Sequence, residues 1–466
     1  MRHRLLRKGV WRRIMRYRSW KVILISLVLF MLYLFNLHYQ MSETQSHQKM
    51  PFLGIDPYTF LPDPTTYFHF ENTSPSSVQG CVKEILIYGN LTDMKGWPDL
   101  SHFYKYFSQS KRKDQEIFYR CHQHDCLLKV SLGTTVSQFR GKDAIIFGML
   151  PKAFKGRLDR LIKEDPEDGQ TWFFYSTETP LRIVDWNGDE RISDLKYHKM
   201  MTYRLDSDIH LPFAYFRRYN DSERLTKLDH SEVNHKANKT KEAVWMSSNC
   251  QQIYWPRLPM LQRLQRLLPF DDFGKCGSFR CLPMRSSRCA DIFRKYHFSL
   301  AFENSECYEY ITERFWWYAV QHGVVPVVYG PPRSDLEIFA PPNSFIHVSD
   351  FDLVKDLAEH LWDVSLSPEK YNGYFEWKRE GEIVHKFPHN IDTLCNILPH
   401  LGNWKVKRLG NSSWFNGCRR QPNEYMYSSY GPKQQKWEYI LWSPWNPNSG
   451  HTLEEEKHIR MQLGRF

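Results

Sequence analysis

Short apolar segments alternate with helical segments along most of this chain, and this alternation restricts the possible folds more than any other feature of the sequence. Residues 84–88 (EILIY), 144–147 (AIIF) and 172–175 (WFFY) have the length and composition of buried strands, and residues 208–211 (DIHL) are a weaker candidate. Strands that alternate with helices form βαβ units and a parallel sheet. We therefore expect residues 81–235 to form a Rossmann-like α/β domain.

The same alternation restarts after a polar stretch at residues 220–241, which is typical of a linker. The expected elements of this second half are strands at 244–246, 298–302 and 324–330, and helices at 258–268, near 289–296 and at 311–323. The sequence thus predicts two Rossmann-like domains that face a cleft, the second at residues 240–420. Residues 421–466 form a tail to which we assign no role.

The N-terminus combines a basic cluster with an apolar run. Residues 1–21 carry nine Lys and Arg residues and no acid, and in the sixteen residues Val22–Leu37 only Ser26 and Asn36 are polar. As a helix this run spans roughly 24 Å, which suits the thinner membranes of the early secretory pathway. A cleavable signal peptide is the alternative, but no pair of small residues marks a cleavage site.

Because a basic flank stays on the cytoplasmic side of a membrane, we expect residues 1–21 to be a cytoplasmic tail and residues 22–37 a type II signal-anchor helix. Residues 38–80 are rich in Pro, Ser and Thr and predict a stem. The expected location is the Golgi membrane, with the body of the protein in the lumen.

The formal net charge of +11 would suggest a nucleic-acid partner if it were spread over the chain. Removing the nine N-terminal cations from 63 basic residues leaves 54, against 52 acidic residues. The body is therefore nearly neutral, and we expect no binding to nucleic acid.

All ten cysteines follow the apolar run, as expected of a body that folds in an oxidising compartment. Residues 121–126 (CHQHDC) and the cysteines at 276, 281 and 289 are rich in metal ligands but lack the two-residue spacing of structural zinc sites. We therefore expect disulfides, of undetermined pairing, and no metal site. Predicted N-glycosylation sites are Asn72, Asn90, Asn220, Asn238 and Asn411.

No glycine-rich phosphate-binding motif is present, so a bound nucleotide must be neutralised by side-chain cations and helix N-termini. Asp206-Ser207-Asp208 has the form of a metal-binding DxD motif, but so short a pattern is common. With Arg204 two residues before it, a turn or a structural salt bridge is the favoured interpretation.

Residues 298–330 hold the densest group of chemically useful side chains. An apolar strand ends directly before residues 303–305 (ENS), at the carboxyl edge where open α/β sheets bind ligands. Tyr310, Glu313 and Arg314 are expected in the first turn of the next helix, near its positive end. From the residues alone, a ligand site and an ordinary helix capped by Thr312 or Ser305 are about equally supported.

This block resembles the donor-binding signature of the α1,3-fucosyltransferases, in which FENS is followed by YITEK and then by VPVV-x-GP. This chain has FENS at 302–305, YITER at 310–314 and VPVVYGP at 325–331. Further similar motifs, in the same order as in the family, are WFFYSTETP at 172–180, YRLDSDIHLP at 203–212, WMSSNC at 245–250, FGKCG at 273–277 and SFIHVSDF at 344–351. The resemblance covers about residues 81–420.

The resemblance implies a GT-B fold and inverting transfer of fucose from GDP-β-L-fucose, with no required metal or other cofactor. The family's proposed catalytic base, the Glu of its E-S/C-P motif, corresponds to Glu178. The donor-binding residues that it implies are Arg257, with Arg263 as the fallback, and Asn304, Tyr310, Glu313 and Arg314. Glu313 is expected on the ribose hydroxyls. Arg314 replaces the family's Lys, which keeps the charge but changes its reach and geometry.

The implied partners are GDP-fucose, glycoprotein glycans and, through the N-terminal helix, the Golgi membrane. The acceptor is the 3-hydroxyl of GlcNAc, with Lewis-type lactosamine antennae favoured and the Asn-linked core GlcNAc as the alternative. An inactive protein of the Golgi that binds glycans or nucleotides is the alternative from another class, and only Arg314 favours it.

Overall fold

The structure of the chain is a computed structural model that describes residues 80–419, except 96, 98–99, 111–115, 228–232, 250–253, 256, 282–286 and 352. The predicted cytoplasmic tail, signal-anchor helix and tail at 421–466, and all of the predicted stem except residue 80, lie outside the described residues. None of the helices that the structure does describe is long and apolar enough to cross a membrane.

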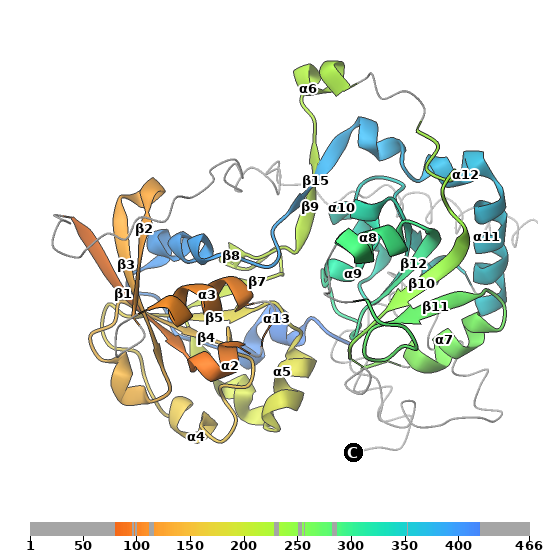
Figure 1. Cartoon of the computed structure of the whole chain (residues 1–466). Helices are drawn as coiled ribbons and strands as arrows, with labels where there is room; N and C mark the ends of the chain where they lie inside the picture. Colours follow the sequence, from red (N-terminus) through yellow and green to blue (C-terminus); the bar gives the residue numbers. More distant parts are fainter. Residues whose placement is uncertain are drawn as a thin grey trace, which may run out of the picture. The chain divides into compact units, whose positions relative to one another are not determined.

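The first sheet has seven strands in the order β2-β3-β1-β4-β5-β7-β8 (Figure 1). Its strands are β1 (Cys81–Tyr88), β2 (Ile117–Cys121), β3 (Cys126–Gly133), β4 (Ala144–Phe147), β5 (Thr171–Ser176), β7 (Lys199–Thr202) and β8 (Ile209–His210). All pairs are parallel except β2 with β3. The helices of this region are α2 (Leu91–Lys95), α3 (Ser101–Gln109), α4 (Leu158–Leu161) and α5 (Pro180–Asn187). The predicted strands at 84–88, 144–147 and 172–175 are confirmed.

Every residue of β4 and β5 is buried. This burial explains why the two strands could be predicted from the sequence. A parallel strand covered on both faces needs a continuous apolar run rather than an alternating one. The hairpin of β2 and β3 lacks such a run and was not predicted. It is fixed instead by the disulfide between Cys81 and Cys126, which face each other where the parallel register of β1 and β3 begins.

The second sheet has five strands in the order β11-β10-β12-β13-β14, and all of its pairs are parallel. Its strands are β10 (Lys241–Met246), β11 (Phe270–Phe273), β12 (Tyr296–Phe302), β13 (Val325–Tyr329) and β14 (Ile346–His347). The surrounding helices are α7 (Arg257–Gln265), α8 (Ser287–Phe293), α10 (Arg333–Phe339), α11 (Val354–Leu366) and α12 (Pro368–Gly373). Two parallel sheets with helical connections confirm the α/β class.

The helix predicted at 311–323 is wrong in length. Helix α9 covers only Glu313–Trp316 and is followed by a turn and a short 3₁₀ segment at Val320–His322. Four consecutive aromatic residues, 315–318 (FWWY), lie in and directly after α9. Phe315 and Trp316 join the core of the first sheet, whereas Tyr318 packs in a separate cluster with Phe293.

After the second sheet the chain returns to the first. Strand β15 (Gly381–His385) pairs antiparallel with β9 (Ala214–Arg218). A 3₁₀ segment at Ile391–His400 and helix α13 (Ser413–Asn416) then pack with the first sheet, and Figure 1 shows α13 in blue beside α5. The returning segment contains Cys395, which forms a disulfide with Cys121, 274 residues earlier in the sequence. No pattern in the sequence predicted this return.

We predict that the Cys121–Cys395 disulfide contributes more to stability than the Cys281–Cys289 disulfide, which closes a separation of only eight residues. Cross-links restrict the unfolded chain more when they close longer loops, with effects of about 2–5 kcal/mol. Replacing both cysteines of each pair by Ser and measuring the free energy of unfolding tests this. Equal losses in the two double variants would contradict the prediction.

Candidate active site

Glu178 lies between the carboxyl end of β5 and the start of α5. The Ser176 hydroxyl donates to the Glu178 carbonyl at 2.9 Å and accepts a hydrogen bond from the Glu178 backbone N–H at 3.1 Å. Trp414 Nε1 also donates to this carbonyl, at 3.2 Å. Pro180 occupies the first position of α5, where its fixed φ favours helix initiation. The backbone of Glu178 is therefore held by one local partner, Ser176, and by one distant partner, Trp414.

The carboxylate of Glu178 faces groups from both halves of the protein. The Tyr310 hydroxyl donates to Oε2 at 3.2 Å, and Arg182 Nε lies 3.5 Å from the same oxygen. The side chain is only 16% exposed. Burial raises the pKa of Glu178, the nearby Arg182 charge opposes that rise, and Glu313 adds to it. A buried carboxylate with a raised pKa is suited to accept a proton.

The carboxyl end of β12 holds a second buried carboxylate, Glu303. Its oxygens accept hydrogen bonds from the backbone and hydroxyl of Thr312 at 2.9 and 2.7 Å, and Arg314 Nη1 lies 3.1 Å away. Burial raises the pKa of Glu303 to about 7, although Arg314 opposes the shift. Gly330, with φ of +137°, makes room for it, since a Cβ there would stand 2.6 Å from the Glu303 Cβ. Arg314 is therefore already ion-paired.

Arg257 is fully buried at the first residue of α7. Its guanidinium donates to the carbonyls of Phe302 and Asn249 at 3.0 and 2.8 Å and to the Ser247 hydroxyl at 3.2 Å, which fixes it at the carboxyl ends of β10 and β12. Its Nε has no hydrogen-bond partner, and no carboxylate of the described residues forms an ion pair with it. Burial, with repulsion from Arg314, lowers its pKa to about 9. Such an uncompensated cation suits an anionic ligand.

Asn304 and its neighbours connect the two halves of the site. The Asn304 carbonyl accepts from the Tyr254 backbone N–H at 2.9 Å, and its side-chain oxygen accepts from the Ser305 hydroxyl at 2.8 Å. Ser305 shares a further hydrogen bond, 3.1 Å long, with Thr179, the residue after Glu178. Predicted residues from positions 178 and 304 are thus brought close together.

Tyr310 lies outside the helix that was expected to hold it, whereas Glu313 lies in the first turn of α9 as expected. Helix α9 begins only at Glu313, with Thr312 as its N-cap, so Tyr310 precedes the helix instead of lying in its first turn. That displacement is what allows its hydroxyl to reach Glu178. The Glu313 carboxylate forms no hydrogen bond or ion pair with another residue in the described part of the chain. Arg263, the fallback for Arg257, lies in the last turn of α7.

The Asp206-Ser207-Asp208 motif is engaged in local contacts. Asp208 accepts hydrogen bonds from the Met200 backbone at 2.8 Å and from Lys199 at 3.0 Å, which joins β7 to β8. Asp206 lies 3.6 Å from Arg204. Over the described ranges, no cluster of three potential metal ligands occurs.

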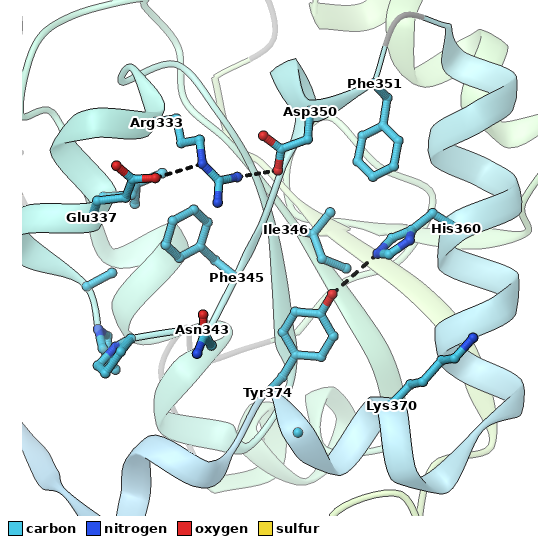
Figure 2. A pocket seen from close by; sticks show the side chains of 15 residues that line it. Arg333, Glu337, Asn343, Phe345, Ile346, Asp350, Phe351, His360, Lys370 and Tyr374 are labelled. Atoms are coloured by element: carbon cyan, nitrogen blue, oxygen red, sulfur yellow. Dashed lines mark hydrogen bonds and ion pairs between the residues drawn. The ribbon is translucent and has the colours of Figure 1, made fainter. Parts of the chain in front are cut away.

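A separate pocket of about 580 Å³ runs along the edge strand β14 (Figure 2). Figure 2 shows Arg333 between Glu337 and Asp350, and the Tyr374 hydroxyl turned to His360, 3.3 Å away. No residue expected to bind donor or acceptor lines this pocket. We therefore place the candidate active site around Glu178, Arg257 and Glu303 rather than here.

Two residues of the site were missed or underrated from sequence. Glu303 was expected at the carboxyl edge of the sheet, but no function was predicted for it. Its ion pair with Arg314 depends on the turn between the two residues. Arg182 was not noticed at all. The signal that could have found it is its position four residues after Glu178, at the spacing where helical side chains meet.

The predicted glycosylation sites differ in accessibility. Asn220, Asn238 and Asn411 are exposed. Asn90 is half-buried, and its amide donates to Asp93 at 2.6 Å. Asn72 lies outside the described residues.

Comparisons with known proteins identify the family of the chain. Residues 236–410 match the family model described as glycosyltransferase family 10 (fucosyltransferase), C-terminal part. Over 286 residues the chain is 30% identical to mouse alpha-(1,3)-fucosyltransferase 7, covering 61% of this chain and 68% of the mouse protein. The chain therefore belongs to the family 10 fucosyltransferases.

A second relative is the Drosophila melanogaster glycoprotein 3-alpha-L-fucosyltransferase A, 39% identical over 215 residues. That alignment covers 46% of this chain and only 41% of the Drosophila protein. A crystal structure of an α1,3-fucosyltransferase with GDP-fucose aligns with a TM-score of 0.38 and 14% identity, covering 66% of this chain and 85% of the other.

Proposed function

We propose that this protein is an inverting α1,3-fucosyltransferase that transfers L-fucose from GDP-β-L-fucose to the 3-hydroxyl of GlcNAc in glycoprotein glycans. The observation that carries the proposal is that a buried carboxylate, Glu178, and a buried cation, Arg257, both contact the end of β12 or the loop that follows it: Arg257 donates to the Phe302 carbonyl, and Glu178 accepts from Tyr310. Membership of the family 10 fucosyltransferases supports the donor and the reaction. We also propose the GT-B arrangement that the family resemblance implies.

In the proposed reaction Glu178 acts as the general base. The 3-hydroxyl oxygen of the acceptor attacks the anomeric carbon of fucose on the face opposite the diphosphate. As the new C–O bond forms, the hydroxyl proton passes to Glu178 and the bond to the diphosphate breaks, with its electron pair leaving on GDP. A single displacement of this kind inverts the anomeric configuration. Tyr310 and Arg182 hold the carboxylate in place.

Arg257 and Arg314 are proposed to neutralise the diphosphate as negative charge develops on it. Arg257 has an unpartnered Nε for this purpose, whereas Arg314 would exchange part of its contact with Glu303 for a phosphate oxygen. Asn304 is proposed to contact the nucleotide-sugar and Glu313 the ribose hydroxyls. With two fixed cations at this edge, we propose that no metal ion or other cofactor is required.

We further propose a Golgi location with a type II membrane anchor at residues 22–37. The support is the basic cluster followed by the apolar run in the sequence. The body of the protein would then meet glycoprotein glycans in the lumen. The four disulfides between described cysteines agree with an oxidising compartment.

The first experiment is an assay of the purified protein with GDP-fucose and two acceptors, a lactosamine and an N-glycan with an accessible core GlcNAc. We expect transfer that depends on GDP-fucose and joins fucose to the 3-hydroxyl of GlcNAc. The lactosamine should be the preferred acceptor. Preference for the core GlcNAc would reverse the acceptor assignment. Binding of GDP-fucose without transfer to either acceptor would instead identify an inactive binding protein.

Glu178→Gln should abolish transfer while leaving GDP affinity within about twofold, because an amide cannot accept the proton. The matched control is Glu190→Gln, which removes an exposed carboxylate from the same region. The measurements are kcat with saturating donor and acceptor, and GDP affinity by calorimetry. Retention of full activity in Glu178→Gln would remove this residue from the mechanism.

Arg257→Ala should weaken GDP binding about 30-fold, which corresponds to about 2 kcal/mol for a lost charge-assisted contact. Arg263→Ala, on the same helix, is the control and should bind GDP normally. The reverse result, with binding lost only in the Arg263 variant, would show that the diphosphate contact was assigned to the wrong arginine. Thermal unfolding of both variants distinguishes a binding defect from a folding defect.

A further inference from the structure

Arg182 is a buried cation beside Glu178 that neither the sequence analysis nor the proposed donor contacts use. Its side chain is 13% exposed, and its Nε lies 3.5 Å from Glu178 Oε2. Two of its nitrogens, Nε and Nη1, are shielded from solvent without a hydrogen-bond partner. A purely structural arginine is normally saturated with hydrogen bonds when buried, so this incomplete coordination calls for another explanation.

Aromatic packing holds the guanidinium where it is. It lies over the ring of Trp186, four residues further along α5, at 4.3 Å from the ring centroid. Trp186 in turn packs edge-on against Trp97 at a centroid distance of 4.8 Å. A cation–π contact of this kind fixes the position of a charge without supplying a counter-charge. The only carboxylate ion-paired with Arg182 over the described ranges is Glu178.

We propose that Arg182 is a positioning residue for the reaction: it keeps Glu178 ionised and oriented so that the carboxylate can accept the acceptor's proton, and Trp186 keeps Arg182 in place. The inference rests on the proposed function and extends it. Arg182 itself exchanges no proton and forms no bond. The proton still passes from the 3-hydroxyl to Glu178, and the electron pair of the broken bond still leaves on GDP.

The charges around Glu178 explain why a cation is needed at this position. Burial opposes ionisation, and Glu313 on α9 opposes it further. Tyr310 favours the carboxylate by donating a hydrogen bond, and Arg314 on α9 favours it through its charge. Arg314, however, is already paired with Glu303. Arg182 is therefore the cation most directly available to the base.

The remaining groups near Glu178 do not replace this cation. Tyr203, which follows β7, and Tyr254 lie close enough to Glu178 for its charge to raise their pKa values. Burial is the larger cause of both rises, so both side chains are neutral. Trp414 binds only the backbone carbonyl of Glu178. Neutral neighbours of this kind can shape the site but cannot offset the charge of the carboxylate.

The direction of the pH effect follows. Because Arg182 lowers the pKa of Glu178, its removal should raise that pKa. Activity requires the ionised carboxylate. As the pH is lowered, a variant without Arg182 should therefore lose activity at a higher pH than the unaltered protein does. An opposite charge at this distance shifts a carboxylate pKa by about one unit or more.

The test compares the pH profile of kcat/KM for the full-length protein and for Arg182→Gln, using GDP-fucose and a lactosamine acceptor. We expect the acid limb of Arg182→Gln to move upward by about one pH unit, with GDP affinity unchanged. Arg182→Lys should keep the limb near its original position, and Trp186→Leu should move it part of the way. The matched control is Arg191→Gln, which removes an exposed, ion-paired arginine from the same region and should leave the profile unchanged.

Three results would overturn the proposal: an acid limb that stays in place in Arg182→Gln, a loss of rate that is equal at every pH, or weakened GDP binding. The last would make Arg182 a donor ligand. If the unaltered protein transfers no fucose, the proposed function fails separately. The Glu178 pKa can then be read directly by carboxyl ¹³C NMR, where Arg182→Gln must raise it for the positioning role to stand.

Discussion

The structure depends on burying charged groups where the strands of two parallel sheets end. Glu178 follows β5, Glu303 follows β12, and Arg257 binds the carbonyls at the ends of β10 and β12. Each buried charge is costly unless a partner compensates it. The compensation here is unequal: Glu303 is engaged by Thr312 and Arg314, whereas Arg257 forms no ion pair with a carboxylate of the described residues. In the proposed reaction Arg257 can therefore meet the diphosphate directly, whereas Arg314 must exchange part of its contact with Glu303.

The sequence predicted the sheets well because their central strands are continuous apolar runs. It failed where structure depends on distant contacts. The helix expected at 311–323 is limited to Glu313–Trp316, and the aromatic residues 315–318 pack into two cores that are built from distant segments. The return of residues 391–416 to the first sheet leaves no local pattern. The roles of Glu178 and Arg257 could be predicted only from the resemblance to a known family. Arg182 could have been found from its position four residues after Glu178. The carbonyls of Phe302 and Asn249 that bind Arg257 lie far from it in the sequence or in an irregular segment, and no spacing pattern predicts them.

Contacts between the two sheets' loops come from several independent segments. The disulfide Cys307–Cys418 ties the loop after β12 to the returning segment, and Arg204 lies 3.6 Å from Glu309 in that same loop. The Leu205 backbone N–H also donates to Glu309 at 2.6 Å. Residues of the YRLDSD motif therefore stabilise the loop that carries Asn304 and Tyr310, two of the proposed donor-binding residues.

The return of the chain also has a consequence for biosynthesis. The first sheet is among the earliest parts to emerge from the ribosome, yet Trp414, which packs on Phe174 of β5 at a centroid distance of 4.7 Å, is translated about 240 residues later. During that interval the nascent protein must keep an apolar face uncovered. The surface of β5 that contacts Trp414 is therefore covered only after residue 414 has been made.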